Sequence, residues 1–537
     1  MSKRISCIIL CLLLAVVSFA SCSNAPAASS TPAASVSQSS AAPAGQDAAP
    51  EESVGYEFPL KEPVTFTMFT VINNIEIGDT LAMQKREEMT NVHWEIQSAM
   101  SVDLAEKRNL LLASNQYPDV FFKASVPMTD VDKYGSQGIF VPLNDAIEKY
   151  GTNIKQVMED RPAIRQMITS EDGNIYCLRE VNEQLPPDGN IAYLNSRWLA
   201  NVGMETPKTV EDLYNVLVAF KEQDANGNGD PNDEIPYSFT GGQNNTKSFY
   251  YLMPFFGVPI DFNSRTVIND GKIEYAMNTD TYKEYLAWNR KIYDEGLMDP
   301  NAFTTTFDQL SAIGQSGDTL GFFFDMGAFR IVGRDRDDEF EGLDPFIPNT
   351  FVPTVGASSV GTFVVTDKCA DPELAFAWQD YFYGEEGGIL AWMGIEGESY
   401  KINSDGTWDW ILGEHKDLGT VREYAGIQGN GAHPSVKPKL WFSGITDPDE
   451  KLLIDIRERL VAQSIEPFPA LRYSDSDTKT LASIQADINP YLLQYASKIV
   501  TGQQDLDATW DEYKTTLENM GLSKMLEIYN TAYNKLK

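Results

Sequence analysis

The sequence predicts an α/β fold, because strand-like and helix-like segments alternate along its first ordered part. Val64–Phe69 is a run of β-branched and aromatic residues, and a second strand is expected near Val92–Ile96. Helices are expected between and after them, over 80–90 and Leu104–Ala113, and Tyr117–Phe122 is a turn that leads into a buried strand. This alternation is typical of a doubly wound α/β lobe. With 537 residues, 42% of them hydrophobic, the chain is long enough for two or more lobes.

The N-terminus has the pattern of a secretory signal. Lys3 and Arg4 precede the apolar run Ile8–Ala20, and Cys22 follows directly after small residues. The run is shorter than the ~20 residues of a membrane span. A cysteine at this place resembles a bacterial lipobox, although Phe19 stands where leucine is usual. We therefore expect a lipoprotein signal over 1–22, with Cys22 carrying the lipid; an ordinary cleaved signal or a membrane anchor is the alternative.

Residues 23–57 are expected to form a disordered tether, because they are rich in Ala, Ser and Pro and cannot bury a core. The formal net charge is −35, and loss of Lys3 and Arg4 with the signal would make it −37, since residues 1–22 contain no acid. Such an acidic surface argues against binding of nucleic acid or anionic lipid. The isolated histidines and the absence of a CxxC motif give no support for a zinc site.

Three later helices have recognisable starts. Thr209 with Asp212 resembles a capping box that opens Val210–Gln223. Asp280 is expected to cap Thr281–Glu295, which ends at Gly296. Asp371 and Pro372 are expected to begin a helix that runs through Tyr383. The aromatic residues on these helices are interpreted as core residues rather than ligand contacts.

The segment from Asp224 to Glu234 has the pattern of a calcium-binding loop. Oxygen-bearing side chains alternate with glycines, which permit tight turns that direct the oxygens inward, and a hard cation prefers six to eight oxygen ligands. The proposed ligands are the side chains of Asp224, Asn226 and Asn228, the carbonyl of Asp230, and either Asp233 or Glu234. The loop resembles the first half of an EF-hand, but Ile235 stands at position twelve instead of an acid. A solvated Asn/Gly turn that binds nothing is the alternative.

Several segments resemble the bacterial extracellular solute-binding proteins of ABC sugar importers, especially the large lipoprotein branch that includes alginate- and oligosaccharide-binding members. The resemblance covers roughly residues 60–537. It is carried by the calcium-type loop with the helix before it, and by the segments Tyr117–Val120, Tyr193–Leu199, Tyr293–Leu297 and Gly394–Tyr400. Where the family often has a proline, Gly173–Tyr176 runs into Cys177-Leu178-Arg179, so the binding surface is expected to be more polar.

This resemblance implies a two-lobed periplasmic-binding-protein-like fold of type II with the ligand cleft between the lobes. The first lobe would contain residues 58–182 and about 325–355, and the second would contain 183–324 and about 356–537. Chain crossings are expected near 180–195 and near 320–328. The candidate ligand-binding residues are Trp392, Phe324, Asp325, Asp119, Arg179 and Glu396. The implied partners are a carbohydrate, a membrane permease and the lipid anchor, and a monomer is expected.

Two other functions remain open at this point. A secreted glycoside hydrolase would need a pair of carboxylates, and Glu396 is the first acid to consider, but the sequence has no nucleophile elbow, HExxH or Walker motif. A surface lipoprotein that binds cationic peptides would also suit an acidic chain with many aromatic residues.

Overall fold

The computed structural model describes residues 55–537 except for 73, 183–189, 231, 243–246, 354–360, 416–417 and 428–432. The predicted signal, Cys22 and most of the predicted tether lie outside the described residues. The tether was expected to extend to residue 57, but Tyr56 already belongs to the fold. Its hydroxyl donates to Asp371 Oδ1 at 2.8 Å, and its ring lies 5.1 Å from that of Tyr150.

The first lobe is built on a four-stranded sheet in the order β10-β3-β1-β2. The strands are β1 (Val64–Ile72), β2 (Val92–Met100), β3 (Val120–Phe122) and β10 (Phe363–Val365). β1 runs parallel to β2 and β3, with Val64 opposite Val92, whereas β10 is antiparallel to β3, with Phe363 opposite Phe122. The predicted strands and helices of residues 64–122 are thus confirmed, with α1 at Leu81–Thr90 and α2 at Leu104–Ser114.

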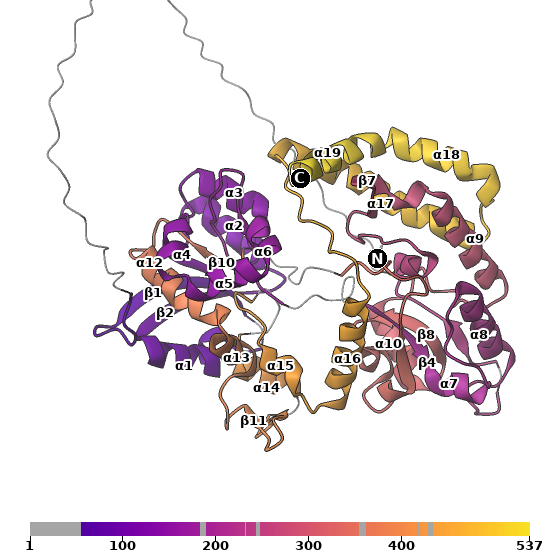
Figure 1. Cartoon of the computed structure of the whole chain (residues 1–537), viewed down its shortest axis with the longest axis horizontal. Coiled ribbons are helices and arrows are strands. Elements are labelled where there is room, and N and C mark those ends of the chain that lie inside the picture. Colours follow the sequence, from indigo (N-terminus) through magenta and orange to yellow (C-terminus); the bar gives the residue numbers. More distant parts are fainter. Residues whose placement is uncertain are drawn as a thin grey trace, which may run out of the picture. The chain divides into compact units, whose positions relative to one another are not determined.

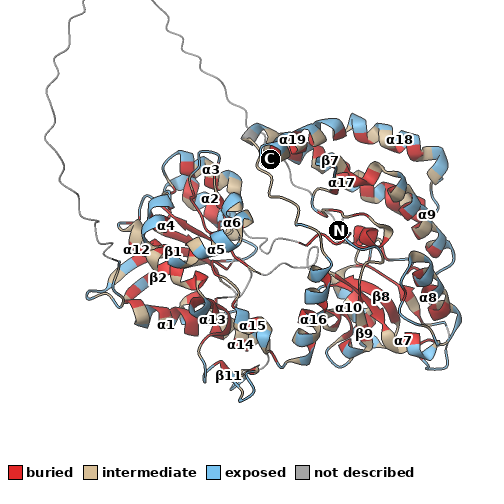
Figure 2. Ribbon diagram, in the orientation of Figure 1, coloured by how far each residue is buried: buried red, intermediate tan, exposed pale blue. Residues whose placement is uncertain are grey.

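Both faces of this sheet are buried, as expected for a doubly wound lobe (Figure 2). Phe66, Met68 and Phe122 pack in one cluster, and Phe69 and Phe121 pack in another, because successive side chains of a strand alternate between the two faces. The covering helices are α3 (Met128–Ser136), α4 (Asn144–Tyr150), α5 (Thr152–Asp160), α6 (Pro162–Ile168), α12 (Pro372–Asp380), α13 (Glu385–Met393), α14 (Leu418–Ala425) and α15 (Lys439–Ser443). A hairpin of β11 (Tyr400–Ile402) and β12 (Trp408–Trp410) packs beside them.

The second lobe contains another four-stranded sheet, in the order β5-β8-β4-β9. Its strands are β4 (Ile191–Asn195), β5 (Ile235–Tyr237), β8 (Leu320–Asp325) and β9 (Phe340–Leu343). β4 is antiparallel to both β8 and β9, and β5 is parallel to β8. Leu194 and Phe324 face one hydrophobic cluster, while Tyr193 and Phe323 face another, so this sheet is also buried on both sides.

The helices of the second lobe come from three parts of the chain (Figure 1). They are α7 (Ser196–Asn201), α8 (Val210–Glu222), α9 (Asp280–Asp294), α10 (Phe307–Ser316), α11 (Ala328–Val332), α16 (Pro448–Ala462), α17 (Asp475–Val500), α18 (Leu506–Asn519) and α19 (Leu522–Asn534). A separate hairpin of β6 (Thr266–Asn269) and β7 (Lys272–Tyr275) contacts α19. Short 3-10 helices lie at Ile77–Asp79, Ser248–Tyr250, Met253–Phe256, Ala276–Asn278, Asp337–Glu339 and Tyr381–Tyr383.

The observed lobe boundaries differ from the predicted ones in two places. β9, expected in the first lobe within 325–355, pairs with β4 of the second sheet, while β10 and α12–α15, expected in the second lobe, belong to the first. The crossing predicted near 320–328 is wrong, because β8 lies entirely within the second sheet. The chain returns to the first lobe between Leu343 and Phe363.

Helix α16 belongs to both lobes. Ile454 packs in a cluster of the first lobe, whereas Leu453, Ile456 and Leu460 pack in a cluster of the second. Ile456 approaches the backbone of Gly342 in β9 so closely that a Cβ at that glycine would lie 2.7 Å from its Cγ2. The glycine therefore allows the helix to lie directly against the sheet.

The predicted helix starts are mostly correct. Thr209 accepts a hydrogen bond from the amide of Asp212, as expected, but the Asp212 carboxylate bonds to the amide of Lys208 rather than that of Thr209. Asp371 caps α12 through the amide of Leu374. The cap of α9 is Thr279 rather than Asp280, because its hydroxyl accepts from the amide of Tyr282.

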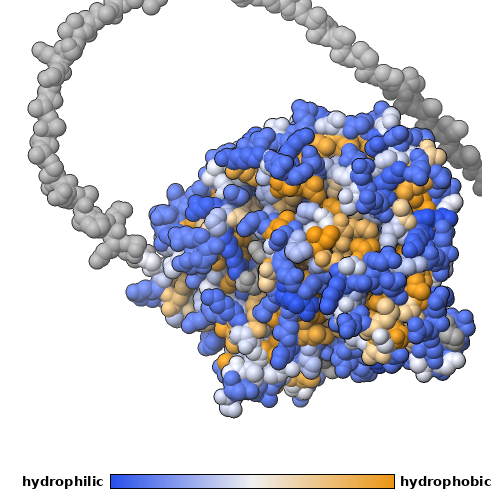
Figure 3. Space-filling view, turned by 45° about the vertical axis from the view of Figure 1, so that its right-hand side comes forward, coloured by the Kyte–Doolittle hydropathy of each residue, from blue (hydrophilic) through white to orange (hydrophobic). Residues whose placement is uncertain are grey.

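Among the described residues, no helix is both long enough and apolar enough to span a membrane. Cys177 and Cys369 are buried free thiols. On the face shown in Figure 3, hydrophobic residues interrupt a mostly hydrophilic surface.

Candidate functional site

The ends of β3 and β8 define a candidate binding site, together with the segment in which the chain passes from the first lobe to the second. Lys123 directly follows β3, and Asp325 ends β8 opposite Ile191, the first residue of β4. Residues 178–182 pair with Phe363 and Val436 of the first lobe just before the chain passes to β4. In open α/β sheets, ligands bind outside the carboxyl ends of the strands. The ends of β3 and β8 are therefore the places where ligand contacts are expected.

The backbone after β3 is strained. Lys123 and Ser125 have φ of 53° and 48°, a left-handed conformation that residues other than glycine rarely adopt. The guanidinium of Arg108 holds this turn by donating to the carbonyl oxygens of Ala124 and Ser125 at 2.8 and 2.9 Å. Such conformations cost of order 1–3 kcal/mol each and concentrate at functional sites.

Buried charged groups lie beside this turn. The Lys123 ammonium donates to the carbonyl oxygen of Ile427, and burial lowers its pKa to about 7, although Glu180 counteracts the shift. Burial also raises the pKa of the Glu180 carboxyl, which accepts a hydrogen bond from Asn182. Burial lowers the pKa of His433 well below its usual value, so this imidazole is neutral at pH 7. The sequence singled out none of these three residues, because they meet only through tertiary packing.

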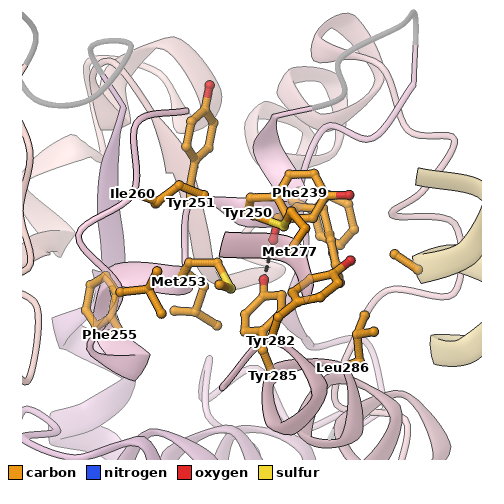
Figure 4. Close-up of a cluster of buried hydrophobic side chains, with 14 of the residues drawn as sticks. Phe239, Tyr250, Tyr251, Met253, Phe255, Ile260, Met277, Tyr282, Tyr285 and Leu286 are labelled. Atoms are coloured by element: carbon orange, nitrogen blue, oxygen red, sulfur yellow. Dashed lines mark hydrogen bonds between the residues drawn. The ribbon is translucent and has the colours of Figure 1, made fainter. Parts of the chain in front are cut away.

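Aromatic side chains gather at the end of β8. Phe324 lines a small cavity together with Tyr251, Phe255 and Phe262. Figure 4 shows that the Tyr251 ring points away from the core residues around Tyr282, with its hydroxyl outermost. Asp325 is buried and forms an ion pair with Arg330 at 3.1 Å. Flat apolar faces beside charged oxygens are the combination that sugar recognition requires.

The other predicted ligand residues have different surroundings. Asp119 directly precedes β3 and Lys123 directly follows it, so the two residues lie at opposite ends of the strand. The carboxylate of Asp119 accepts hydrogen bonds from both the amide and the hydroxyl of Thr67, at 2.7 and 2.8 Å. Trp392 is a core residue of the first lobe, and its indole nitrogen donates to Ser435 at 3.1 Å. The side chain of Arg179 is buried, whereas Glu396 is exposed.

The predicted calcium loop is folded around its own side chains. Asn226 Nδ2 donates to Asp233 Oδ1 at 2.9 Å, and Asn228 Nδ2 donates to Asp233 Oδ2 at 2.7 Å. Asp224 Oδ2 accepts from the amide of Gly229 at 2.9 Å. Outside the loop, Arg197 donates to the carbonyl of Asn226 at 3.2 Å. In the described part of the chain, no group of three or more Asp, Glu, His or Cys side chains is arranged to hold a metal ion.

Two carboxylate oxygens of the loop nevertheless fit a cation. Asp224 Oδ1 and Glu234 Oε2 are buried and have no hydrogen-bond partner within the described structure. Burial raises the pKa of Glu234, and backbone hydrogen bonds counteract the shift only in part. A cation that contacts both oxygens would compensate the charge of the two carboxylates.

A groove of about 800 Å³ lies where α6, α15, α16 and residues 466–470 meet, and we call it the α6–α16 groove. Asn182, the last described residue before the crossing, also lines it. The groove therefore adjoins the point at which the chain leaves the first lobe for β4. No local sequence pattern indicates the groove, because its walls come from separate segments of the chain.

The similarity to proteins of known structure and function extends over both lobes. The fructooligosaccharide ABC transporter substrate-binding protein FusA of Streptococcus pneumoniae serotype 4 (strain ATCC BAA-334 / TIGR4) is 29% identical over 504 residues, which are 90% of this chain and 92% of FusA. The structure of FusA from S. pneumoniae in complex with kestose matches with a TM-score of 0.69 at 26% identity, covering 88% of this chain and 99% of that one. A FusA EF-hand mutant in complex with fructo-nystose matches over the same shares at 26% identity with a TM-score of 0.70.

Two further proteins are more distant. The alginate-binding protein AlgQ2, in a structure without calcium ion, has a TM-score of 0.64 at 20% identity over 89% of this chain and 99% of that one, which shows a shared fold. Lipoprotein LipO of Bacillus subtilis (strain 168) is 24% identical over 336 residues, 60% of this chain and 64% of LipO.

These likenesses show that the two α/β lobes form the two-lobed fold of solute-binding proteins. The sequence profile of the bacterial extracellular solute-binding proteins matches residues 79–389, which is more than half of the chain and includes parts of both lobes. The chain therefore belongs to the bacterial extracellular solute-binding protein family.

Proposed function

We propose that this protein is the substrate-binding component of an ABC transporter and that it captures an oligosaccharide. The observation that carries the proposal is the similarity to FusA, which extends over 90% of the chain and includes both lobes. Membership of a family of solute-binding proteins also favours binding over the glycoside hydrolase alternative.

The ligand is proposed to bind between the ends of β3 and β8. Phe324 and Tyr251 would offer aromatic faces to the C–H side of a sugar ring, while Asp325, Glu180 and Arg179 would bond its hydroxyls. Ligand contacts with both lobes would stabilise a closed form over an open one, and a membrane permease would accept the closed form. Glu396 is retained as an exposed candidate.

Isothermal titration calorimetry with kestose, nystose and maltotriose tests the function directly. Saturable binding of an unchanged oligosaccharide supports the proposal, and a rise of the melting temperature with ligand concentration would follow from binding to the folded state. Chromatography of the ligand after prolonged incubation is the control for hydrolysis. Binding of a cationic peptide but of no oligosaccharide would refute the proposal.

We also propose a structural calcium ion in the loop Asp224–Glu234. Its support is the pair of buried, unpartnered oxygens of Asp224 and Glu234, together with the existence of an EF-hand in FusA. Asn226, Asn228, the carbonyl of Asp230 and Asp233 would complete the ligand set. Asn226 and Asn228 would turn their amide oxygens toward the ion.

We further propose that Cys22 is lipidated and anchors the protein to the outside of the cell membrane, near the permease. The family is extracellular, and the similar protein LipO is a lipoprotein. The protein is proposed to act as a monomer.

A further inference from the structure

The α6–α16 groove has the size and the composition of a small-ligand site. Its volume of about 800 Å³ falls within the range of about 300–1,000 Å³ that such sites usually have. Flat apolar side chains on its walls are Pro162, Phe442, Phe468 and Pro469. They suit the apolar faces of several consecutive sugar rings better than a single small solute.

Arg457 of α16 stands out among the groove residues because its guanidinium has no hydrogen-bond partner among the described residues. Its Nε is buried without a hydrogen-bond partner, and the side chain makes no hydrogen bond or ion pair with any other described residue. Leaving a buried donor unpaired is unfavourable, because the group has lost its hydrogen bonds to water. Burial accordingly lowers the pKa of Arg457, although Tyr193 and Glu450 counteract the shift.

Arg459, two residues further along the same helix, does have partners within the protein. Its Nε forms an ion pair with Asp344 at 2.8 Å, and it also donates to the carbonyl of Gly342. Arg459 thus stabilises the contact between α16 and the second sheet. Arg457 has no such role and instead lines the groove.

The charges around the groove balance. Three cationic side chains and three anionic ones line it, namely Arg161, Lys439 and Arg457, and Asp160, Glu458 and Glu466. A cavity without excess charge offers no net attraction to an acidic ligand. It suits a neutral ligand with many hydroxyl oxygens.

From these observations we infer that Arg457 is a specificity-determining residue, which donates hydrogen bonds to hydroxyl oxygens of a neutral oligosaccharide lying along the α6–α16 groove. This inference rests on the proposed function and extends the proposed site at the ends of β3 and β8 into the groove, since α16 lines the groove and also, through Leu460, the small cavity beside Phe324. A planar guanidinium presents several N–H groups in a fixed fork, so it can bond two neighbouring hydroxyls of one sugar. The ligand would supply the acceptors that the protein itself does not.

The experiment compares Arg457→Met with Arg459→Met, two equal truncations on one helix. Calorimetric titration with kestose, nystose and maltotriose measures affinity, and thermal unfolding without ligand measures stability. Arg457→Met should weaken binding of the recognised oligosaccharide 10- to 100-fold and leave the melting temperature unchanged or raised. Arg459→Met should lower the melting temperature and change affinity less than threefold.

Three results would overturn the inference, and they separate it from the proposed function. If the wild-type protein binds a neutral oligosaccharide and Arg457→Met binds it equally well, the role of Arg457 is refuted while the proposed function stands. If trigalacturonate binds more tightly than every neutral sugar and loses affinity in Arg457→Met, the assignment to a neutral ligand is wrong. If the wild-type protein binds neither a neutral oligosaccharide nor trigalacturonate, the proposed function and the inference both fail.

Discussion

Asn226 donates a hydrogen bond from its side-chain amide to Asp233 Oδ1 at 2.9 Å, so an amide joins the first and last parts of the loop. At the same time, one oxygen each of Asp224 and Glu234 is buried without a partner. The loop is therefore held together by its own hydrogen bonds and still retains oxygens for a cation.

We predict that calcium stabilises the protein through this loop. At a calcium concentration 100 times its dissociation constant, binding adds about 2.7 kcal/mol to the free energy of unfolding. A chelator should therefore lower the melting temperature, and Glu234→Gln should reduce the response to added calcium. Asn232→Ala, in an exposed residue of the same loop, is the matched control. An unchanged melting curve on chelation would contradict the proposed site.

We predict that Asp119 stabilises the first sheet and does not bind the ligand. Asp119→Ala removes two hydrogen bonds that Thr67 donates to the carboxylate, each of a kind worth about 1.5–3 kcal/mol, and should lower the free energy of unfolding by roughly 2–4 kcal/mol. Denaturant unfolding measures this loss. Titration of the folded variant should give wild-type affinity, and a large loss of affinity at unchanged stability would instead restore Asp119 as a ligand residue.

Lys123 should make stability depend on alkaline pH. Its ordinary pKa of 10.5 applies to the unfolded chain, and burial lowers the pKa in the folded protein to about 7. Between these values the unfolded state binds more protons, so the free energy of unfolding rises with pH, by up to about 1.4 kcal/mol per unit. Burial lowers the pKa of Lys437 to about 7 as well, so it contributes in the same direction.

The variant Lys123→Met measures how much Lys123 contributes to the pH dependence of the free energy of unfolding. Its stability relative to the wild-type protein should fall as pH rises from 7.5 to 9.5, because the wild-type protein gains stability that the variant cannot gain. Urea unfolding at several pH values provides the measurement. Lys208→Met, at an exposed lysine, should show no such trend. Parallel curves for wild type and Lys123→Met would mean that the ammonium keeps its ordinary pKa.

We predict that Cys22→Ser releases the protein from the membrane. Without the thiol no lipid can be attached, so the protein should move from the detergent phase to the aqueous phase in a phase-partition assay. Cys7→Ser, within the predicted signal, should leave the partition unchanged. If Cys22→Ser remains in the detergent phase, another part of the chain must hold it there.

Local signals made much of the fold predictable. The strand at Val64–Phe69 and the cap at Asp371 depend on residues that are close in sequence, and the structure contains both. The cap of α9 was placed one residue too late because Thr279 and Asp280 are both good capping residues, and only the backbone geometry selects between them. The boundaries between the lobes depend on long-range pairing, and no local pattern shows that Phe363 returns to lie beside Phe122.

The candidate site was less predictable for the same reason. Phe324 and Asp325 were recognised because they end a clearly apolar strand, but Lys123, Glu180 and Arg457 come from three separate segments. Trp392 packs in the core of the first lobe and its indole nitrogen donates to Ser435, so its role in ligand binding stays a prediction. A sequence pattern indicates which residues could bind a sugar, but burial decides which of them are occupied elsewhere.

Helix α16 places side chains in the hydrophobic clusters of both lobes and carries Arg457 near its middle. A helix of 15 residues moves as a rigid unit. If α16 keeps its contacts with one lobe while the lobes rotate, its contacts with the other lobe must change. We expect a rotation between the lobes to change the width of the α6–α16 groove, because α16 lines the groove and packs on both lobes. Binding of a sugar in that groove would then favour one arrangement of the lobes, and the permease would recognise that arrangement.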